Sequence, residues 1–142
     1  MIGKYPAKMD DKGRLFVPSK LRQELGTDFF ATIGVNDGHR CLTLYKADDW
    51  HTMENNYNNL PVSKRTGAVN LIFTCATECI PDKQYRFSLT ENLLTYAGIT
   101  RDVVLVGRAG QAEIWEAAEY NAFELENLTP EKLLASLEAI GL

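Results

Sequence analysis

The sequence contains few cysteines, and that shortage argues against a disulfide framework and against a metal site. Only three cysteines, Cys41, Cys75 and Cys79, occur in 142 residues, and an odd number at irregular spacing does not indicate paired disulfides. Cys75 and Cys79 could share one face of a helix, but no further Cys or His lies nearby to complete the four ligands of a closed zinc site. We therefore expect no metal and no other cofactor.

Long apolar runs and catalytic motifs are also missing. No apolar stretch approaches the ~20 residues that cross a bilayer, and the N-terminal segment has no apolar stretch of signal-peptide length. These absences predict an intracellular protein without a membrane partner. No G-x-S-x-G, Walker motif or dinucleotide fingerprint occurs. The neighbouring carboxylates Asp10 and Asp11 should point to different sides of the chain, so we predict no enzyme activity and no small-molecule substrate.

The net charge of −4 is distributed unevenly along the chain. Residues 1–26 contain six basic and three acidic residues, whereas residues 109–142 contain one basic and seven acidic residues. Because salt limits the reach of surface charge to about 10 Å, an acidic protein can still hold phosphate at a basic end. The alternative is an ordinary solvated surface whose charges have no partner.

The most informative feature is an internal repeat, in which residues 9–26 can be aligned with residues 81–98. This alignment superimposes Asp10 on Asp82, Arg14 on Arg86, Leu21 on Leu93 and Gly26 on Gly98. Downstream, residues 31–34 resemble 104–107 and residues 42–50 resemble 113–120 in the same order. Such self-similarity is typical of a duplicated structural unit.

Both copies predict the same order of elements: strand, tight turn, strand, short helix and two further strands. In the first copy the strands are expected at 4–9, 14–17, 29–35 and 41–46, with a turn at 10–13 and a helix from Pro18 or Ser19 to Gly26. In the second copy they are expected at 77–81, 86–89, 103–108 and 112–116, with a turn at 82–85 and a helix from Thr90 to Gly98. One copy is too small to bury much apolar surface, so the two copies should share a core.

We therefore predict an α+β, mainly β fold of two half-domains that form a pseudo-symmetric β barrel or an interleaved sheet. The expected boundaries are 3–50 for the first half-domain, 51–75 for a helical connector, 76–122 for the second half-domain and 123–142 for a C-terminal amphipathic helix. Apolar residues recur at helical spacing in the connector and in the tail, at Trp50, Met53, Tyr57 and Leu60, at Val69, Ile72, Phe73 and Ala76, and at Leu133, Leu134, Leu137 and Ile140. These stripes predict core packing or contact with another subunit.

The turn at residues 10–14 is the best candidate for a binding site. Asp10 can accept hydrogen bonds from backbone N–H groups two or three residues further on and can pair with Arg14. Gly13 permits a positive φ without steric cost. The turn would then present Lys12 and Arg14 together, a lysine for phosphate and an arginine for phosphate or a guanine edge. An ordinary hairpin with a surface ion pair is the alternative.

Several of these segments resemble the two repeats of the MraZ family over about residues 3–120. They are Asp10-x-Lys12-Gly13-Arg14 with residues 15–18, Lys20-x-Arg22, residues 41–45 with Trp50, and then residues 82–86, 96–98, 102–107 and 113–115. The resemblance implies two AbrB-like (SpoVT-AbrB) domains of the swapped-hairpin β-barrel type, assembled into a ring-shaped homo-oligomer. It also implies binding to double-stranded promoter DNA at short direct repeats upstream of the division and cell wall gene cluster, including the protein's own gene. The expected effect is repression, and the expected location is the cytoplasm, on the nucleoid.

The family's D-x-x-x-R motif is its DNA-binding signature, and the resemblance assigns it to Asp10 and Arg14 and again to Asp82 and Arg86. The candidate DNA contacts are Arg14, Lys12, Lys20, Arg22, Arg86 and Lys83, and the candidate turn-shaping residues are Asp10, Gly13, Asp82 and Tyr85. The second copy departs from the family pattern, since Tyr85 stands where glycine is usual and Thr90 where proline is usual. A bulky side chain does not enter positive φ cheaply, so we expect the second turn to differ in shape.

Two other functions stay open on the sequence alone. One is a non-catalytic oligomeric scaffold with weakened DNA binding, which the net acidity and the altered second copy favour. The other is an AbrB-type antitoxin that neutralises a toxin. The length of the chain, its second full copy and the lack of a long disordered tail count against the antitoxin.

Overall fold

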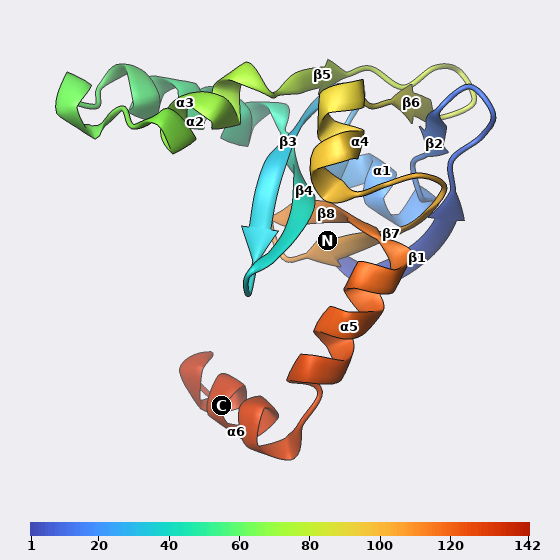
Figure 1. Cartoon of the computed structure of the whole chain (residues 1–142), viewed down its shortest axis with the longest axis vertical. Coiled ribbons are helices and arrows are strands. Elements are labelled where there is room, and N and C mark those ends of the chain that lie inside the picture. The colour runs from blue at the N-terminus through green and yellow to red at the C-terminus, as the bar shows by residue number, and fades with distance from the viewer.

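A computed structural model describes residues 1–142 as an α+β protein, which confirms the predicted class (Figure 1). The strands are β1 (Ile2–Lys8), β2 (Arg14–Phe16), β3 (Phe29–Asn36), β4 (His39–Lys46), β5 (Thr77–Cys79), β6 (Arg86–Ser88), β7 (Asp102–Arg108) and β8 (Gln111–Glu116). The helices are α1 (Ser19–Leu25), α2 (Ala47–Asn58), α3 (Gly67–Thr74), α4 (Glu91–Ala97), α5 (Ala117–Asn127) and α6 (Pro130–Ala139), with a 3-10 turn η1 (Val62–Lys64). Helices hold 41% of the residues and strands 32%, so helical residues outnumber strand residues.

Strands of the two copies interleave throughout the structure. The larger sheet has the order β1-β7-β8-β4-β3-β5, and β2 pairs with β6 in a separate ladder. β1 of the first copy therefore pairs with β7 of the second, β4 pairs with β8, and β3 with β5. The expectation of a shared core is confirmed. The sheet does not close into a barrel, because β2 and β6 pair only with each other and leave β1 and β5 as edge strands.

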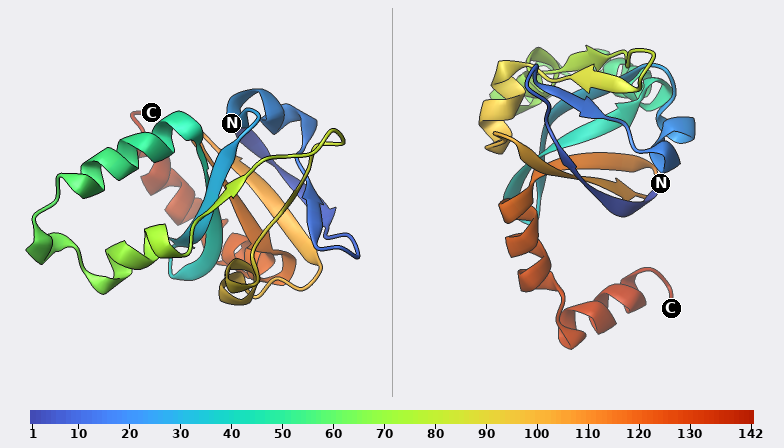
Figure 2. Two further views of the ribbon diagram at one scale, coloured as in Figure 1. Left: turned by 90° about the horizontal axis from the view of Figure 1, so that it is seen from above. Right: turned by 90° about the vertical axis from the view of Figure 1, so that its right-hand side faces the viewer.

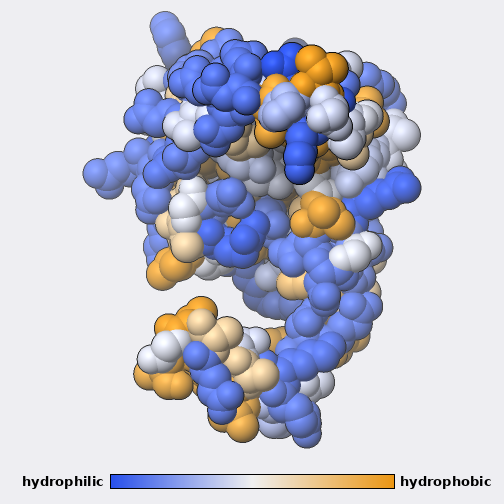
Figure 3. Space-filling view, turned by 90° about the vertical axis from the view of Figure 1, so that its left-hand side faces the viewer, coloured by the Kyte–Doolittle hydropathy of each residue, from blue (hydrophilic) through white to orange (hydrophobic).

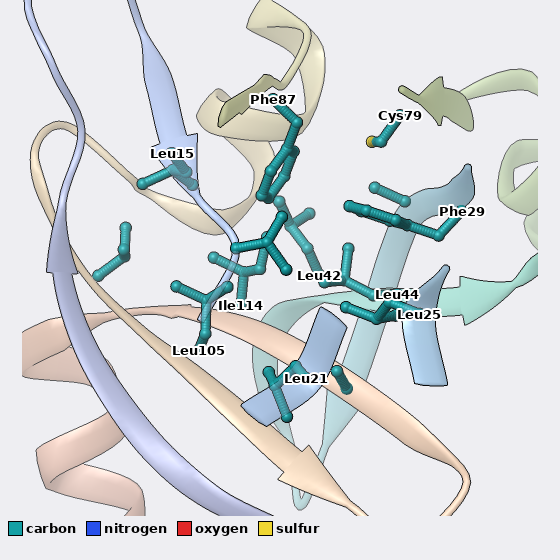
Figure 4. Packing of buried hydrophobic residues seen from close by; sticks show 14 of the residues in the cluster. Leu15, Leu21, Leu25, Phe29, Leu42, Leu44, Cys79, Phe87, Leu105 and Ile114 are labelled. Atoms are coloured by element: carbon teal, nitrogen blue, oxygen red, sulfur yellow. The ribbon is translucent and has the colours of Figure 1, made fainter. Parts of the chain in front are cut away.

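The core lies between the two sheets and draws on both copies (Figure 4). The rings of Phe29 and Phe87, one from each copy, meet edge to face with 5.2 Å between their centroids. α1 and α4 contribute Leu21 and Leu93, which are fully buried. One copy alone is too small to bury this many apolar side chains, so we expect each half to need the other in order to fold.

The ends of the short helices follow local sequence signals. Thr90 caps α4, because its side chain accepts a hydrogen bond from the backbone N–H of Leu93. Gly98 ends the same helix in the left-handed conformation. α1 begins at Ser19 after Pro18, whose fixed φ suits a helix start.

Each copy ends in a pair of helices that leaves the β body (Figures 1 and 2). α2 and α3 pack against each other through the rings of Tyr57 and Phe73, 4.8 Å apart. The expected single tail helix over 123–142 is instead the end of α5 followed by α6. Thr129 caps α6 and Pro130 is its first residue, and proline lacks the N–H that would continue α5. α5 runs through the expected boundary at residue 122.

The cysteines show no metal site. Cys75 follows the last residue of α3 and Cys79 lies in β5, so the possibility that they share a helical face is wrong. Nowhere do three or more His, Cys, Asp or Glu side chains gather as metal ligands would. Burial raises the pKa of both Cys41 and Cys79 to about 12, which leaves them as protonated thiols at neutral pH. No helix is both long and apolar enough to cross a bilayer.

Candidate nucleic-acid interface

Residues 10–14 form a tight turn between β1 and β2 that is built around the side chain of Asp10. Asp10 Oδ1 accepts hydrogen bonds from the backbone N–H groups of Lys12 and Arg14, at 2.9 and 2.8 Å. Asp10 Oδ2 accepts a third from Arg14 Nε, at 2.8 Å. Gly13 has a φ of +76°, and its N–H donates to the Asp10 carbonyl. The carboxylate thus fixes both the turn and the direction of the guanidinium.

Residues 82–86 form a second turn with the same hydrogen bonds. Asp82 Oδ1 accepts from the N–H groups of Gln84 and Arg86, and Asp82 Oδ2 accepts from Arg86 Nε at 3.0 Å. Tyr85 has a φ of +63° and occupies the left-handed region as Gly13 does. The expectation that Tyr85 gives the second turn a different shape is therefore wrong. The hydrogen bonds of Asp82 outweigh the local preference of tyrosine for negative φ.

Both arginines face outward from the short ladder that the two turns introduce. The register of this ladder pairs Arg14 with Ser88, Leu15 with Phe87, and Phe16 with Arg86. Alternate residues of a strand face opposite sides, and the middle pair is buried in the core. Arg14 and Arg86 therefore lie on the solvent side, with Cα atoms about 8 Å apart from strand rise and spacing. Their side chains are 26% and 31% exposed.

These hydrogen bonds lower the pKa of both carboxyl groups below the ordinary aspartate value. The backbone N–H of Arg14 is the largest cause that lowers the pKa of Asp10, and the Arg14 side chain adds to it. The backbone N–H of Arg86 does the same for Asp82. Each arginine keeps its two terminal nitrogens outside the ion pair, since only Nε contacts the carboxylate. Those nitrogens have the fork geometry that suits phosphate or a guanine edge.

The other sequence-predicted basic residues lie within the turns or on α1 and differ in their surroundings. Lys12, Lys20 and Lys83 are exposed, and their ammonium groups form no ion pair within 4.0 Å of a carboxylate. Arg22 is half-buried instead. Its Nε donates to the Val17 carbonyl at 2.9 Å, so this side chain is held by the protein.

Sequence reasoning missed residues that share the outward face or border a turn. Phe16, half exposed, and Ser88 lie on the same face as the arginines because they are two positions away along each strand. Counting two residues on from each arginine would have found them. Arg101 is exposed, and its carbonyl accepts a hydrogen bond from the N–H of Met9 at 2.9 Å. Arg101 lies beside the first turn only because β1 pairs with β7, and this pairing could not be predicted from the sequence.

Comparison with known proteins identifies one family for this chain. A family model described as "MraZ protein, putative antitoxin-like" matches residues 1–69 and 72–134. Proteins named "Transcriptional regulator MraZ" from Halothermothrix orenii and Alkaliphilus metalliredigens are each 34% identical to this chain over 99% of both chains. A protein of the same name from Limosilactobacillus reuteri is 36% identical over 89% of this chain and 88% of its own. The resemblance found in the motifs is confirmed, and the chain belongs to the MraZ family.

Proposed function

We propose that this protein is a transcriptional regulator that binds double-stranded DNA through the outer face of the β2–β6 ladder. The observation that carries the proposal is the pair of matched turns, in which Asp10 and Asp82 hold Arg14 and Arg86 on one solvent-facing surface. Exposed Lys12 and Lys83 lie within the two turns and add positive charge, and exposed Lys20 lies on α1, whose Arg22 contacts the second turn. Phosphate contacts position a protein on DNA and arginine reads bases, so this surface has the groups for both tasks. The proposal assigns no catalytic step to the chain.

The DNA target that we propose is the set of short direct repeats upstream of the division and cell wall gene cluster, which includes the protein's own gene. The proposed effect is repression, in the cytoplasm and on the nucleoid. A gel-shift titration with the upstream region of the protein's own gene tests this target, and a scrambled fragment of equal length is the control. We expect specific binding that weakens steeply with salt. Equal affinity for both fragments, or a flat salt response, would contradict the proposal.

We also propose that copies of the chain assemble head to tail into a ring. α6 and the residue that follows it carry four large apolar side chains that are between 42% and 81% exposed, namely Leu133, Leu134, Leu137 and Ile140. They gather on the part of the molecule that projects from the body (Figure 3). Residues 117–142 contain five acidic residues and one basic, whereas residues 55–77 contain Lys64, Arg65 and no acidic residue. Charge therefore favours contact of this tail with Lys64 and Arg65, which lie between α2 and α3, and not with α2 itself, which contains Asp48, Asp49 and Glu54 and no Lys or Arg.

The partner surface is the pair of helices α2 and α3. A cavity of about 220 Å³ lies between them and is lined mainly by apolar side chains, among them Met53, Tyr57 and Phe73. Contact between two different surfaces of one chain closes into a ring when the rotation allows it. Assembly would also raise the affinity for repeated DNA sites through avidity.

The oligomer proposal is tested by Leu133→Asp combined with Leu137→Asp, measured by size-exclusion chromatography with light scattering. We expect a shift to monomers, because two buried charges would oppose apolar contact. Val35→Asp on β3 is a matched control, since Val35 is also exposed, at 71%, and lies outside both surfaces. An unchanged mass for the double variant would exclude α6 as the contact.

An antitoxin is a second candidate, because the matching family model is described as putative antitoxin-like. Under that proposal the chain would bind a small toxin protein. Affinity purification of the tagged chain from its own host tests it. Stoichiometric recovery of a small basic or nuclease-like protein would favour the antitoxin, whereas recovery of the chain alone with promoter DNA favours the regulator.

A further inference from the structure

Tyr85 holds a backbone conformation that an L side chain rarely adopts, and Arg22 lies directly against its ring. The φ of Tyr85 is +63°. The guanidinium carbon of Arg22 lies 3.7 Å from the centroid of the Tyr85 ring, which is the geometry of a close cation–π contact. Gly13, at the equivalent position of the first turn, reaches positive φ without such a contact.

Arg22 is itself fixed in place by the neighbouring strand. Its Nε donates to the carbonyl of Val17, and its guanidinium lies 4.7 Å from the centroid of the Phe16 ring. The N–H of Val17 in turn donates to the carbonyl of Tyr85 at 2.8 Å. One residue, Val17, thus connects the backbone of the second turn with the side chain that covers it.

A cavity borders the contact between Arg22 and Tyr85. This cavity of about 360 Å³ borders Arg22, Tyr85 and Asp82, and its lining includes Gly26 and Pro81. The ring of Phe16 meets Tyr85 only edge on, at 6.5 Å between centroids. Arg22 therefore covers a face of the Tyr85 ring, whereas Phe16 meets the ring only at an edge.

We propose that Arg22 is a positioning residue that clamps Tyr85 and so keeps the second turn, with Arg86, in its DNA-binding geometry. The effect on DNA rests on the proposed function, but the effect on the turn does not. The clamp acts on one turn only, because the internal repeat places Leu94 where the first copy has Arg22. The first turn depends on Gly13, and the second depends on a residue supplied by the first copy.

Hydrogen–deuterium exchange of the full chain, read by mass spectrometry, tests the clamp without DNA. Residues 82–85 report on the second turn, and residues 10–13, which lie outside the β2–β6 ladder, serve as an internal control. For Arg22→Ala and Arg22→Lys we expect exchange at residues 82–85 to rise roughly tenfold, from the loss of the cation–π contact and one hydrogen bond. Residues 10–13 should keep their protection. Lysine preserves the charge but lacks the planar group that stacks and donates through Nε.

Variants that also contain Tyr85→Gly test whether Arg22 acts through the Tyr85 side chain. Glycine adopts positive φ unaided, so adding Arg22→Ala or Arg22→Lys to Tyr85→Gly should change exchange at residues 82–85 by less than about twofold. A tenfold rise in the double variant, or equal rises in both turns for Arg22→Lys, would overturn the clamp. Should Arg22→Ala lose protection along the whole chain, Arg22→Lys alone and combined with Tyr85→Gly still decides between these outcomes.

DNA affinity separates a positioning residue from a phosphate contact. If Arg22 positions the turn, Arg22→Ala and Arg22→Lys weaken binding to a similar extent, and Tyr85→Gly restores most of the loss. If Arg22 binds phosphate, Arg22→Lys keeps most of the affinity and Tyr85→Gly restores none, which would overturn the inference. If no variant and not even the natural chain binds DNA, the proposed function fails while the exchange result still stands on its own.

Discussion

The two turns have the same hydrogen bonds and different sequences. Asp10 and Asp82 each accept from two backbone N–H groups and from one arginine Nε. Glycine occupies the positive-φ position in the first turn and tyrosine in the second. The aspartate and arginine therefore define the shape, and the residue between them has only to tolerate it. Tyrosine can do so when a neighbour such as Arg22 holds its ring.

The surroundings of the two turns differ more than their shapes. Lys12 lies within the first turn and Arg101 beside it, and both are exposed, while Lys83 is the exposed basic residue within the second. A phosphate backbone should therefore meet more positive charge at the first turn. The comparison leads us to expect two DNA-binding turns of unequal strength.

Replacement of the arginines should have the largest effect. Arg14→Ala should remove a base or phosphate contact that is worth about 1–3 kcal/mol per subunit, and assembly should multiply the loss. We expect no gel shift at concentrations that saturate the natural chain, with the oligomer intact by light scattering.

Arg86→Ala should weaken binding less, by roughly tenfold. If Arg14→Ala and Arg86→Ala lose the same DNA affinity, the basic residues beside each turn contribute little to the difference between the turns. If Arg14→Ala binds DNA unchanged, the first turn is excluded as the site.

Loss of a turn aspartate should have the next largest effect. Asp10→Ala removes the acceptor of three hydrogen bonds and frees the Arg14 guanidinium. We expect roughly tenfold weaker DNA binding, because an arginine without its partner is poorly oriented. Asp11→Ala is the matched control, since Asp11 is exposed and accepts no side-chain hydrogen bond; it should bind as well as the natural chain or slightly better. Losing a negative charge favours binding to DNA, so a loss of equal size in Asp11→Ala would show that the turn geometry set by Asp10 is not the cause.

A smaller effect is expected from the backbone of the first turn. A Cβ added at Gly13 would meet no atom within 4 Å, so Gly13→Ala should lose stability only through its positive φ, by about 1 kcal/mol. Urea unfolding measures this change. Gly110→Ala is the control, because Gly110 also has open space around it and a φ outside the positive region. If the free energy of unfolding falls by well over about 1 kcal/mol, the first turn accepts a side chain at its positive-φ position less readily than the second turn accepts Tyr85.

Acid should affect the two turns alike and only mildly. The hydrogen bonds that lower the pKa of Asp10 and Asp82 act on the folded state. Their stabilising contribution is therefore present above the ordinary carboxyl pKa of 3.8 and is lost as the pH falls through the lower, folded value. The amide signals of Arg14 and Arg86 in NMR spectra should move together below pH 3.8. Movement of the Arg86 signal at a clearly higher pH would show a weaker second turn.

Much of the local structure could be predicted from the residues. The strands, the two turns, the caps of α4 and α6 and the confirmed α+β class follow from hydrophobic alternation and from residues such as Thr90 and Gly98. The shape of the second turn could not be predicted, because the contact between Arg22 and Tyr85 joins residues far apart in the sequence. The tail divides at Pro130, because Thr129 and Pro130 mark a helix start that the predicted single span of 123–142 does not separate from α5.

The sequence by itself determined that two Asp–Arg turns exist, because each aspartate lies within hydrogen-bonding reach of the residues that follow it. Only the tertiary structure decided that both arginines share one face, since β2 must pair with β6 of the other copy to bring them together. It also decided that Tyr85 preserves the turn, because the arginine that covers its ring comes from α1 of the first copy. Local hydrogen bonds depend on spacing along the chain, whereas pairing and stacking depend on which apolar surfaces the two copies bury together.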